Sequence, residues 1–151
     1  MSAKSAEDIW GLEYDWIAVD AVGHVGFFST AGAGYAPKEF LRDTDAYSTA
    51  IEAILALPGS ADASPTARPL SVVHDTWRMM AERGVFAFDS NPNGGPYLRE
   101  AVPKHPIRVE ELPAEAATVA RRILIEGLRF SEVQEIDCAR LHELSQKGAE
   151  E

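Results

Sequence analysis

The stretch from Tyr14 to Pro37 constrains the fold more than any other part of the chain. Side chains alternate along 15–20 and again along 25–30, with aromatic and β-branched residues on both faces. This alternation predicts two strands with at least one fully buried face. The glycine-containing turn at 21–23 makes the pair a hairpin rather than a βαβ unit. Because a hairpin alone is unstable in water, the later elements must pack on it.

Helical spacing of apolar residues after the hairpin predicts a helix from Phe40 to Leu55, in which Asp43 or Thr44 caps a second start. A shorter helix is expected over Ser71–Arg83, with Gly84 as its stop. Another begins at Pro113 and closes at Gly127. Further strands are expected at 85–89, 97–102, 107–112 and 128–137, a surface loop at 60–69, and a short terminal helix around Leu141 and Leu144.

This order of elements, with short connections between strands, predicts an α+β fold. We expect a single domain over residues 1–151, with a mainly antiparallel sheet that starts at the N-terminal hairpin and carries the helices on one face. Ile9, Trp10 and Leu12 are expected to lie against the hairpin. The predicted core contains Trp16, Val19, Phe27, Ile51, Leu55, Trp77, Phe86, Phe88, Ile123 and Leu124.

The net charge of −10 is unevenly distributed along the chain. Residues 1–60 carry 9 acidic and 3 basic side chains, residues 61–109 carry 5 and 6, and residues 110–151 carry 10 and 5. Such a balance disfavours nucleic acid and anionic membrane surfaces as partners, and allows a basic protein partner. The single cysteine, Cys138, excludes an internal disulfide. With neither a signal-peptide pattern nor a transmembrane run, a cytoplasmic location is expected.

No motif in the sequence contains a complete set of catalytic residues, cofactor-binding residues or metal ligands. Gly32-x-Gly34-x-x-Pro37 lies between a strand and a helix, but proline replaces the third glycine of a dinucleotide-binding loop. His24 and Asp20 could form an acid–base or metal pair, although a solvated turn histidine is the simpler interpretation. We therefore expect no catalytic residues, no cofactor and no metal.

Three stretches together resemble a family of small, acidic, largely uncharacterised bacterial proteins. Some of its members look like immunity proteins of polymorphic toxin systems. The resemblance is carried by Asp15–Asp20 with Gly23–Thr30, by Trp77 with Ala81–Asp89, and by Pro106-Ile107 with Glu111–Pro113 and Phe130. It implies a non-enzymatic immunity protein that neutralises a bacterial toxin by covering its active or substrate-binding surface. The alternative is a small-ligand-binding protein or an enzyme that uses a pocket between Trp16, Tyr35 and the Gly32–Gly34 loop.

An acidic immunity protein suits a basic toxin domain, because opposite charges accelerate encounter. Acidic residues in loops and at helix starts are the ones expected to be exposed, and a turn tip beside an aromatic suits an interface anchor. The predicted partner-binding residues are Asp43, Asp45, Asp89, Asn93, Tyr97, Glu110 and Glu111.

Overall fold

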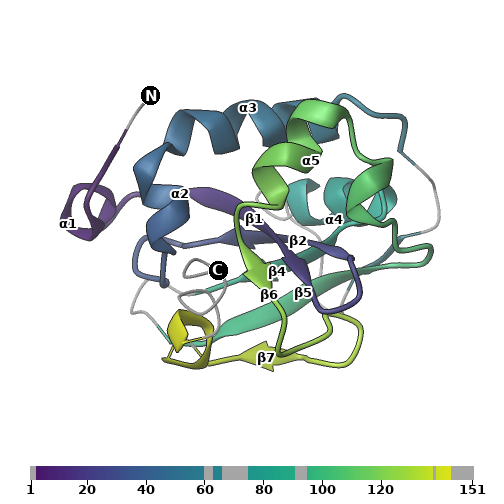
Figure 1. Cartoon of the computed structure of the whole chain (residues 1–151). Coiled ribbons are helices and arrows are strands. Elements are labelled where there is room, and N and C mark those ends of the chain that lie inside the picture. The colour runs from purple at the N-terminus through teal and green to yellow at the C-terminus, as the bar shows by residue number, and fades with distance from the viewer. Residues whose placement is uncertain (1–2, 60–62, 66–74, 91–94, 138, 144–151) are drawn as a thin grey trace.

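The computed structural model shown in Figure 1 describes residues 3–59, 63–65, 75–90, 95–137 and 139–143. Its sheet has seven strands in this part of the chain, in the order β3-β5-β4-β2-β1-β6, with β7 also paired to β5. The strands are β1 (Asp15–Asp20), β2 (Val25–Ser29), β3 (Ala63–Pro65), β4 (Phe86–Asp89), β5 (Tyr97–Pro103), β6 (Leu124–Ile125) and β7 (Glu135–Ile136). The combination of helices with a mixed sheet confirms the α+β class.

The predicted hairpin is present, with β1 antiparallel to β2 and Ile17 paired with Phe27. The prediction of a mainly antiparallel sheet is wrong, because β2 pairs in parallel with β4 and β1 in parallel with β6. Helical segments precede both β4 and β6, and each carries the chain back across the sheet before the parallel strand begins. The sheet is therefore mixed.

The helices are α1 (Ala6–Ile9), α2 (Lys38–Arg42), α3 (Thr44–Leu55), α4 (Asp75–Glu82) and α5 (Ala114–Ala120), with a short 3-10 helix η2 (Val109–Glu111). In Figure 1, α3, α4 and α5 lie on the upper side of the sheet. α3 and α5 pack on β1 and on each other, and α4 packs on β4 and β5. The predicted second start at Asp43 is confirmed, since its carboxylate caps α3 by accepting the Ala46 N–H at 3.3 Å.

The two faces of the sheet differ in side-chain type. Trp16, Phe28 and Phe88 stack side by side on one face, with ring centroids 4.1 and 4.9 Å apart. Phe130 closes this face from the loop before β7, with its ring centroid 5.4 Å from that of Phe88. The alternate residues, such as Ile17 and Phe27 with Ala87, point the other way, toward the helices.

Most of the predicted core is confirmed as part of one buried cluster. Leu55 and Leu124 are only partly buried against that cluster. Trp10 and Leu12 do not lie against the hairpin as expected, because α1 buries Ile9 and turns these two side chains outward.

Three predicted elements in the second half of the chain differ from the structure. The segment 107–112 forms η2 instead of a strand, because the Glu111 carboxylate accepts the Arg108 N–H at 2.7 Å and closes a turn. The helix predicted over 113–127 is α5, which ends at Ala120, and the chain then extends into β6. Only Glu135–Ile136 of the expected last strand pairs with the sheet. Residues 139–143 are helical, and Leu144 lies outside the described residues.

Candidate functional site

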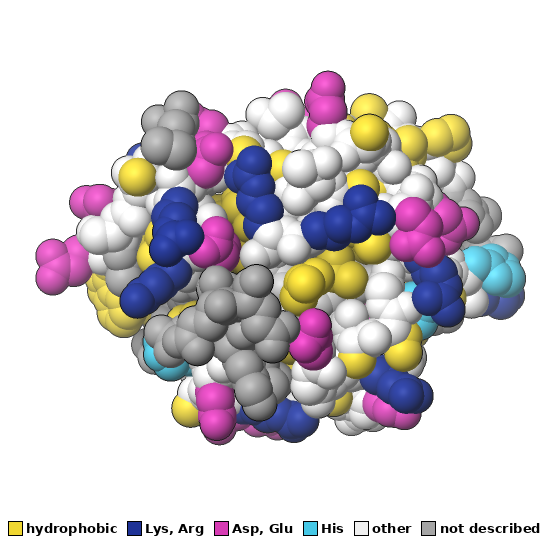
Figure 2. Space-filling model, viewed as in Figure 1, with side chains coloured by type: hydrophobic (Ala, Val, Ile, Leu, Met, Phe, Trp, Pro, Cys, Tyr) yellow, Lys and Arg dark blue, Asp and Glu magenta, His cyan; other side chains and the backbone are white. Residues whose placement is uncertain are grey.

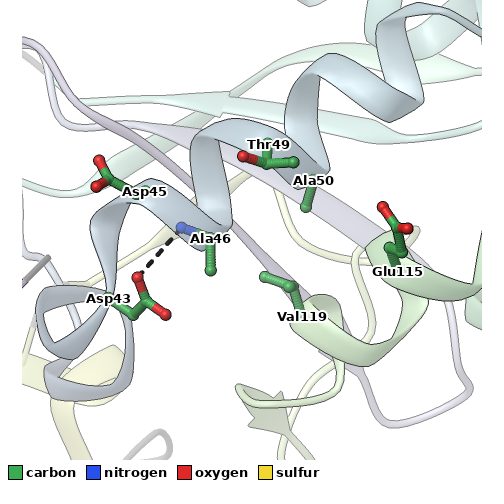
Figure 3. Close-up of a pocket in the computed structure, with 7 residues that line it drawn as sticks. All are labelled: Asp43, Asp45, Ala46, Thr49, Ala50, Glu115 and Val119. Carbon is green, nitrogen blue, oxygen red and sulfur yellow. Dashed lines mark hydrogen bonds between the residues drawn. The ribbon is translucent and has the colours of Figure 1, made fainter. Parts of the chain in front are cut away.

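A groove between α3 and α5 brings two of the predicted partner-binding residues together. We call this feature the acidic groove. Its volume is about 270 Å³, and it is lined by Asp43, Asp45, Ala46, Thr49, Ala50, Glu115 and Val119. Figure 3 shows the two aspartates at the start of α3, Glu115 across from them on α5, and small apolar side chains between. Carboxylates thus stand at both ends of a shallow apolar floor.

The local sequence explains both the hollow and its charge. Alanines and a threonine on the α5-facing side of α3 are too small to fill the space between the two helices. Asp45 and Glu115 occupy the first turns of their helices, where a negative charge interacts favourably with the helix dipole. Both side chains are exposed. Asp43 is half-buried, and its other carboxylate oxygen lies 3.8 Å from Arg122 Nη1.

The remaining predicted residues are dispersed. Glu110 and Glu111 are exposed in η2, directly before α5, and Glu111 is engaged in closing that turn. Asp89 is half-buried at the end of β4. Tyr97 is fully buried, so the expectation that it is exposed is wrong. Its hydroxyl donates to the Tyr35 carbonyl at 2.6 Å and accepts the Trp16 indole N–H at 3.2 Å, which fixes the ring inside the aromatic core. Asn93 lies outside the described residues.

Asp89 belongs to a row of polar residues across three strands that the sequence pattern does not reveal as a row. Asp15 on β1 pairs with Ser29 on β2, and Ser29 pairs with Asp89 on β4. Residues in register point to the same face, so all three side chains lie on the helix side of the sheet. The Ser29 hydroxyl donates to Asp15 Oδ1 at 2.9 Å. Burial nevertheless raises the pKa of the Asp15 carboxyl to about 6, an effect that this hydrogen bond opposes and the charge of Glu13 reinforces.

Asp20 and His24 lie together in the hairpin turn, where the Asp20 carboxylate holds the backbone. Asp20 is buried, and its Oδ1 accepts the N–H groups of Val22 and His24 at 3.1 and 2.9 Å. Its Oδ2 accepts the Phe130 N–H at 2.7 Å and lies 4.0 Å from His24 Nδ1. The carboxylate therefore ties the hairpin turn to the loop that closes the aromatic face.

The Gly32–Gly34 loop is held by close backbone contacts. The Gly34 N–H donates to the Thr30 carbonyl at 2.7 Å, and the Gly32 carbonyl accepts the Gly11 N–H, also at 2.7 Å. Trp16, which the ligand-binding alternative placed in a pocket beside this loop, is fully buried. No observation on these residues favours a bound ligand, and the alternative stays an untested prediction.

Replacing Gly34 with alanine tests this account of the loop. A Cβ at this position would lie 2.6 Å from the Ser90 Cβ and 2.8 Å from the Thr30 carbonyl oxygen. We expect the free energy of unfolding to fall by about 1–3 kcal/mol, the usual cost of overpacking. Urea denaturation measures the change. The exposed Gly127→Ala variant serves as a comparison, and equal stability of the two variants would contradict the close contact.

The wider surface places positive and negative side chains side by side. On the face drawn in Figure 2, Lys and Arg side chains lie among the acidic ones.

Within the described residues, no group of three or more His, Cys, Asp or Glu side chains is arranged to hold a metal ion. In the same part of the chain, no helix has the length and apolar character needed to cross a bilayer.

Comparison with known proteins returned no match: no family model, no curated protein and no solved structure is similar to this chain.

Proposed function

We propose that this protein is a non-enzymatic binding protein whose acidic groove receives a basic segment of a partner protein. The observation that carries the proposal is that exposed Asp45 and Glu115 line the same groove, with small apolar side chains between them. An arginine or lysine has the matching shape, since its aliphatic stem can lie on Ala46, Ala50 and Val119. Its charged head then donates hydrogen bonds to the carboxylates, and such charge-assisted hydrogen bonds are stronger than those between neutral groups.

The sequence resemblance gives this partner a more specific identity. We propose a cytoplasmic immunity protein, with the basic domain of a bacterial toxin as its partner. A net charge of −10 supports this pairing, because it attracts a basic domain over long range and raises the association rate. Arg122 lies beside Asp43 and offsets its charge, so Asp45 and Glu115 contribute most of the attraction in the groove. Occupying the toxin's basic substrate-binding surface is then sufficient for neutralisation, and no chemistry is required.

The test is the association rate with the basic product of a neighbouring toxin-like gene, measured at low and at physiological salt. We expect the D45K/E115K variant to associate at least about tenfold more slowly, with a flatter salt dependence and a smaller change in dissociation rate. Asp43 is left intact in this variant because its carboxylate caps α3.

The matched control is E132K/E135K, which changes the net charge equally at two exposed positions near β7. It should associate at close to the parent rate. If D45K/E115K associates as fast as this control, the groove is not the binding surface. If neither the parent protein nor the control binds the toxin-like product, the immunity function is wrong.

A further inference from the structure

The N-terminal segment presents two large apolar side chains to solvent, which we call the apolar pair. Trp10 is 68% exposed and Leu12 is 53% exposed, more than any other large hydrophobic residue that the structure describes. They flank Gly11, whose φ of +82° turns the chain between them. Because folding ordinarily covers most of a tryptophan, an exposed indole beside an exposed leucine is typical of an interaction site.

The backbone that carries the apolar pair is fixed on both sides of α1. Before the helix, the Lys4 N–H donates to the Leu41 carbonyl at 2.8 Å. After it, the Gly11 N–H donates to the Gly32 carbonyl at 2.7 Å. The buried Ile9 side chain anchors the helix itself in the core. Because this backbone is already ordered, binding at the apolar pair would cost little conformational entropy.

Two exposed glutamates lie on either side of the apolar pair in the chain. Glu7 precedes Trp10 by three residues, and the Trp10 N–H donates to the Glu7 carbonyl at 3.3 Å, so both side chains belong to one turn. Glu13 directly follows Leu12. Within the part of the chain that the structure describes, neither glutamate forms an ion pair. In Figure 2, acidic and hydrophobic side chains adjoin at the left edge of the molecule, where Figure 1 places α1.

The basic side chains of this region gather at the other end of α1. Lys4 precedes the helix, and together with Lys38 and Arg42 it lines a hollow of about 230 Å³. Two of these three bases have an acid of their own, since Arg42 pairs with Glu39 and Lys4 attracts the Asp8 carboxylate. The two glutamates beside the apolar pair have no such counter-charge, so the end of α1 that carries the pair is acidic.

From this arrangement we propose that the apolar pair and the two glutamates bind a short basic segment of a partner protein, in which an apolar residue is flanked by arginine or lysine. An arginine lies favourably over the exposed face of the Trp10 indole through a cation–π interaction. Its guanidinium also donates charge-assisted hydrogen bonds to the nearby Glu7 carboxylate. The apolar residue of the partner then covers Leu12.

The charges favour this occupant over a second copy of the chain. A second copy would bring its own glutamates against these glutamates, and each copy carries a net charge of −10. The surface shares no lining residue with the acidic groove, so it constitutes a second contact site and does not depend on the proposed function.

The experiment titrates the full-length protein with the peptide acetyl-Lys-Arg-Leu-Phe-Arg-Lys-amide in a calorimeter at physiological salt. One comparison peptide replaces every basic residue with glutamate, and the other replaces Leu-Phe with Ser-Ser. We expect the basic peptide to bind at least about tenfold more tightly than either comparison peptide. Trp16 and Trp77 are buried, so a change of tryptophan fluorescence on binding reports on Trp10.

Trp10→Ala should weaken binding of the basic peptide by at least about tenfold, as truncation of an aromatic hot spot does. The E7K/E13K variant should weaken it at least as much. E132K/E135K changes the net charge equally at exposed positions elsewhere, and should bind the peptide nearly as the parent does. Circular dichroism checks that each variant is folded.

The groove variant D45K/E115K separates this proposal from the proposed function, since it should bind the peptide as the E132K/E135K control does. If D45K/E115K lost the peptide while Trp10→Ala kept it, the peptide would occupy the groove, and only the proposal for the apolar pair would be wrong. Equal binding of the three peptides, or undiminished binding by Trp10→Ala, would also overturn it. So would sedimentation showing a parent dimer that Trp10→Ala dissociates, because a second copy would then cover the surface.

Discussion

Replacing Phe88 with alanine is expected to lower the free energy of unfolding by about 3–5 kcal/mol. The ring is fully buried and stacks on Phe28, and its centroid lies 5.4 Å from that of Phe130. Its loss would leave a cavity between β4 and the loop that closes the aromatic face. Urea denaturation, followed by the near-ultraviolet circular dichroism of the aromatic cluster, measures the change.

Leu98→Ala on the adjacent strand is the control for Phe88→Ala. Leu98 is paired with Asp89 but is 38% exposed, so its truncation should cost less than about 1 kcal/mol. If the two variants had the same stability, Phe88 would not be part of a packed core, and the assignment of β4 would fail.

Asp15→Asn is expected to stabilise the protein at neutral pH. Burial raises the pKa of Asp15 to about 6 from a model-peptide value of 3.8, so the folded state holds this proton more tightly than the unfolded state. Stability contributed by the proton is therefore lost as pH rises from about 4 to about 6, and the cost of the buried charge is fully present above that range. A shift of this size corresponds to about 3 kcal/mol. Partial solvent access to the carboxylate reduces the expected effect to about 2 kcal/mol.

The measurement compares the unfolding free energies of Asp15→Asn and the parent across this pH range. The stability advantage of the variant should be about 2 kcal/mol larger at neutral pH than near pH 3.5, because asparagine still accepts the Ser29 hydroxyl and carries no charge. A constant difference between Asp15→Asn and the parent would mean that Asp15 is not buried as a carboxylate.

The hairpin and the helix start at Asp43 could be predicted because their signals are local. Alternation over five or six residues identifies β1 and β2, and a capping aspartate needs only the amide three residues later. The parallel pairings could not be predicted in this way. Leu124–Ile125 has two residues and continues the apolar pattern of α5, so only its pairing with β1 identifies it as a strand.

The candidate site was predicted in part for a similar reason. The helix start predicts Asp43 and Asp45 as exposed acids, but Glu115 lies about seventy positions later and reaches them only through the contact of α3 with α5. The preceding turn, rich in glycine and asparagine, predicts a surface position for Tyr97. Its hydrogen bonds to Trp16 and Tyr35 come from distant parts of the chain. Hydrophobicity alone predicts an interior position for Trp10, which is exposed in the structure.

The strand order has a consequence for self-association. An unpaired edge strand can recruit another chain, and long flat edges are the common starting points of aggregation. Here the four longest strands lie inside the sheet. At one end of the strand order, β1 pairs with β6, a strand of two residues. On the opposite side, β3 covers Ala101–Pro103 of β5, while β7 covers Tyr97 and Leu98. Within the described residues, the outer edge at β3 has only three residues and ends in Pro65, which leaves little backbone there for an intruding strand to pair with. On the opposite side, β6 pairs only with Val19 and Asp20 of β1, so the first part of β1 is where a second chain would have most backbone to pair with.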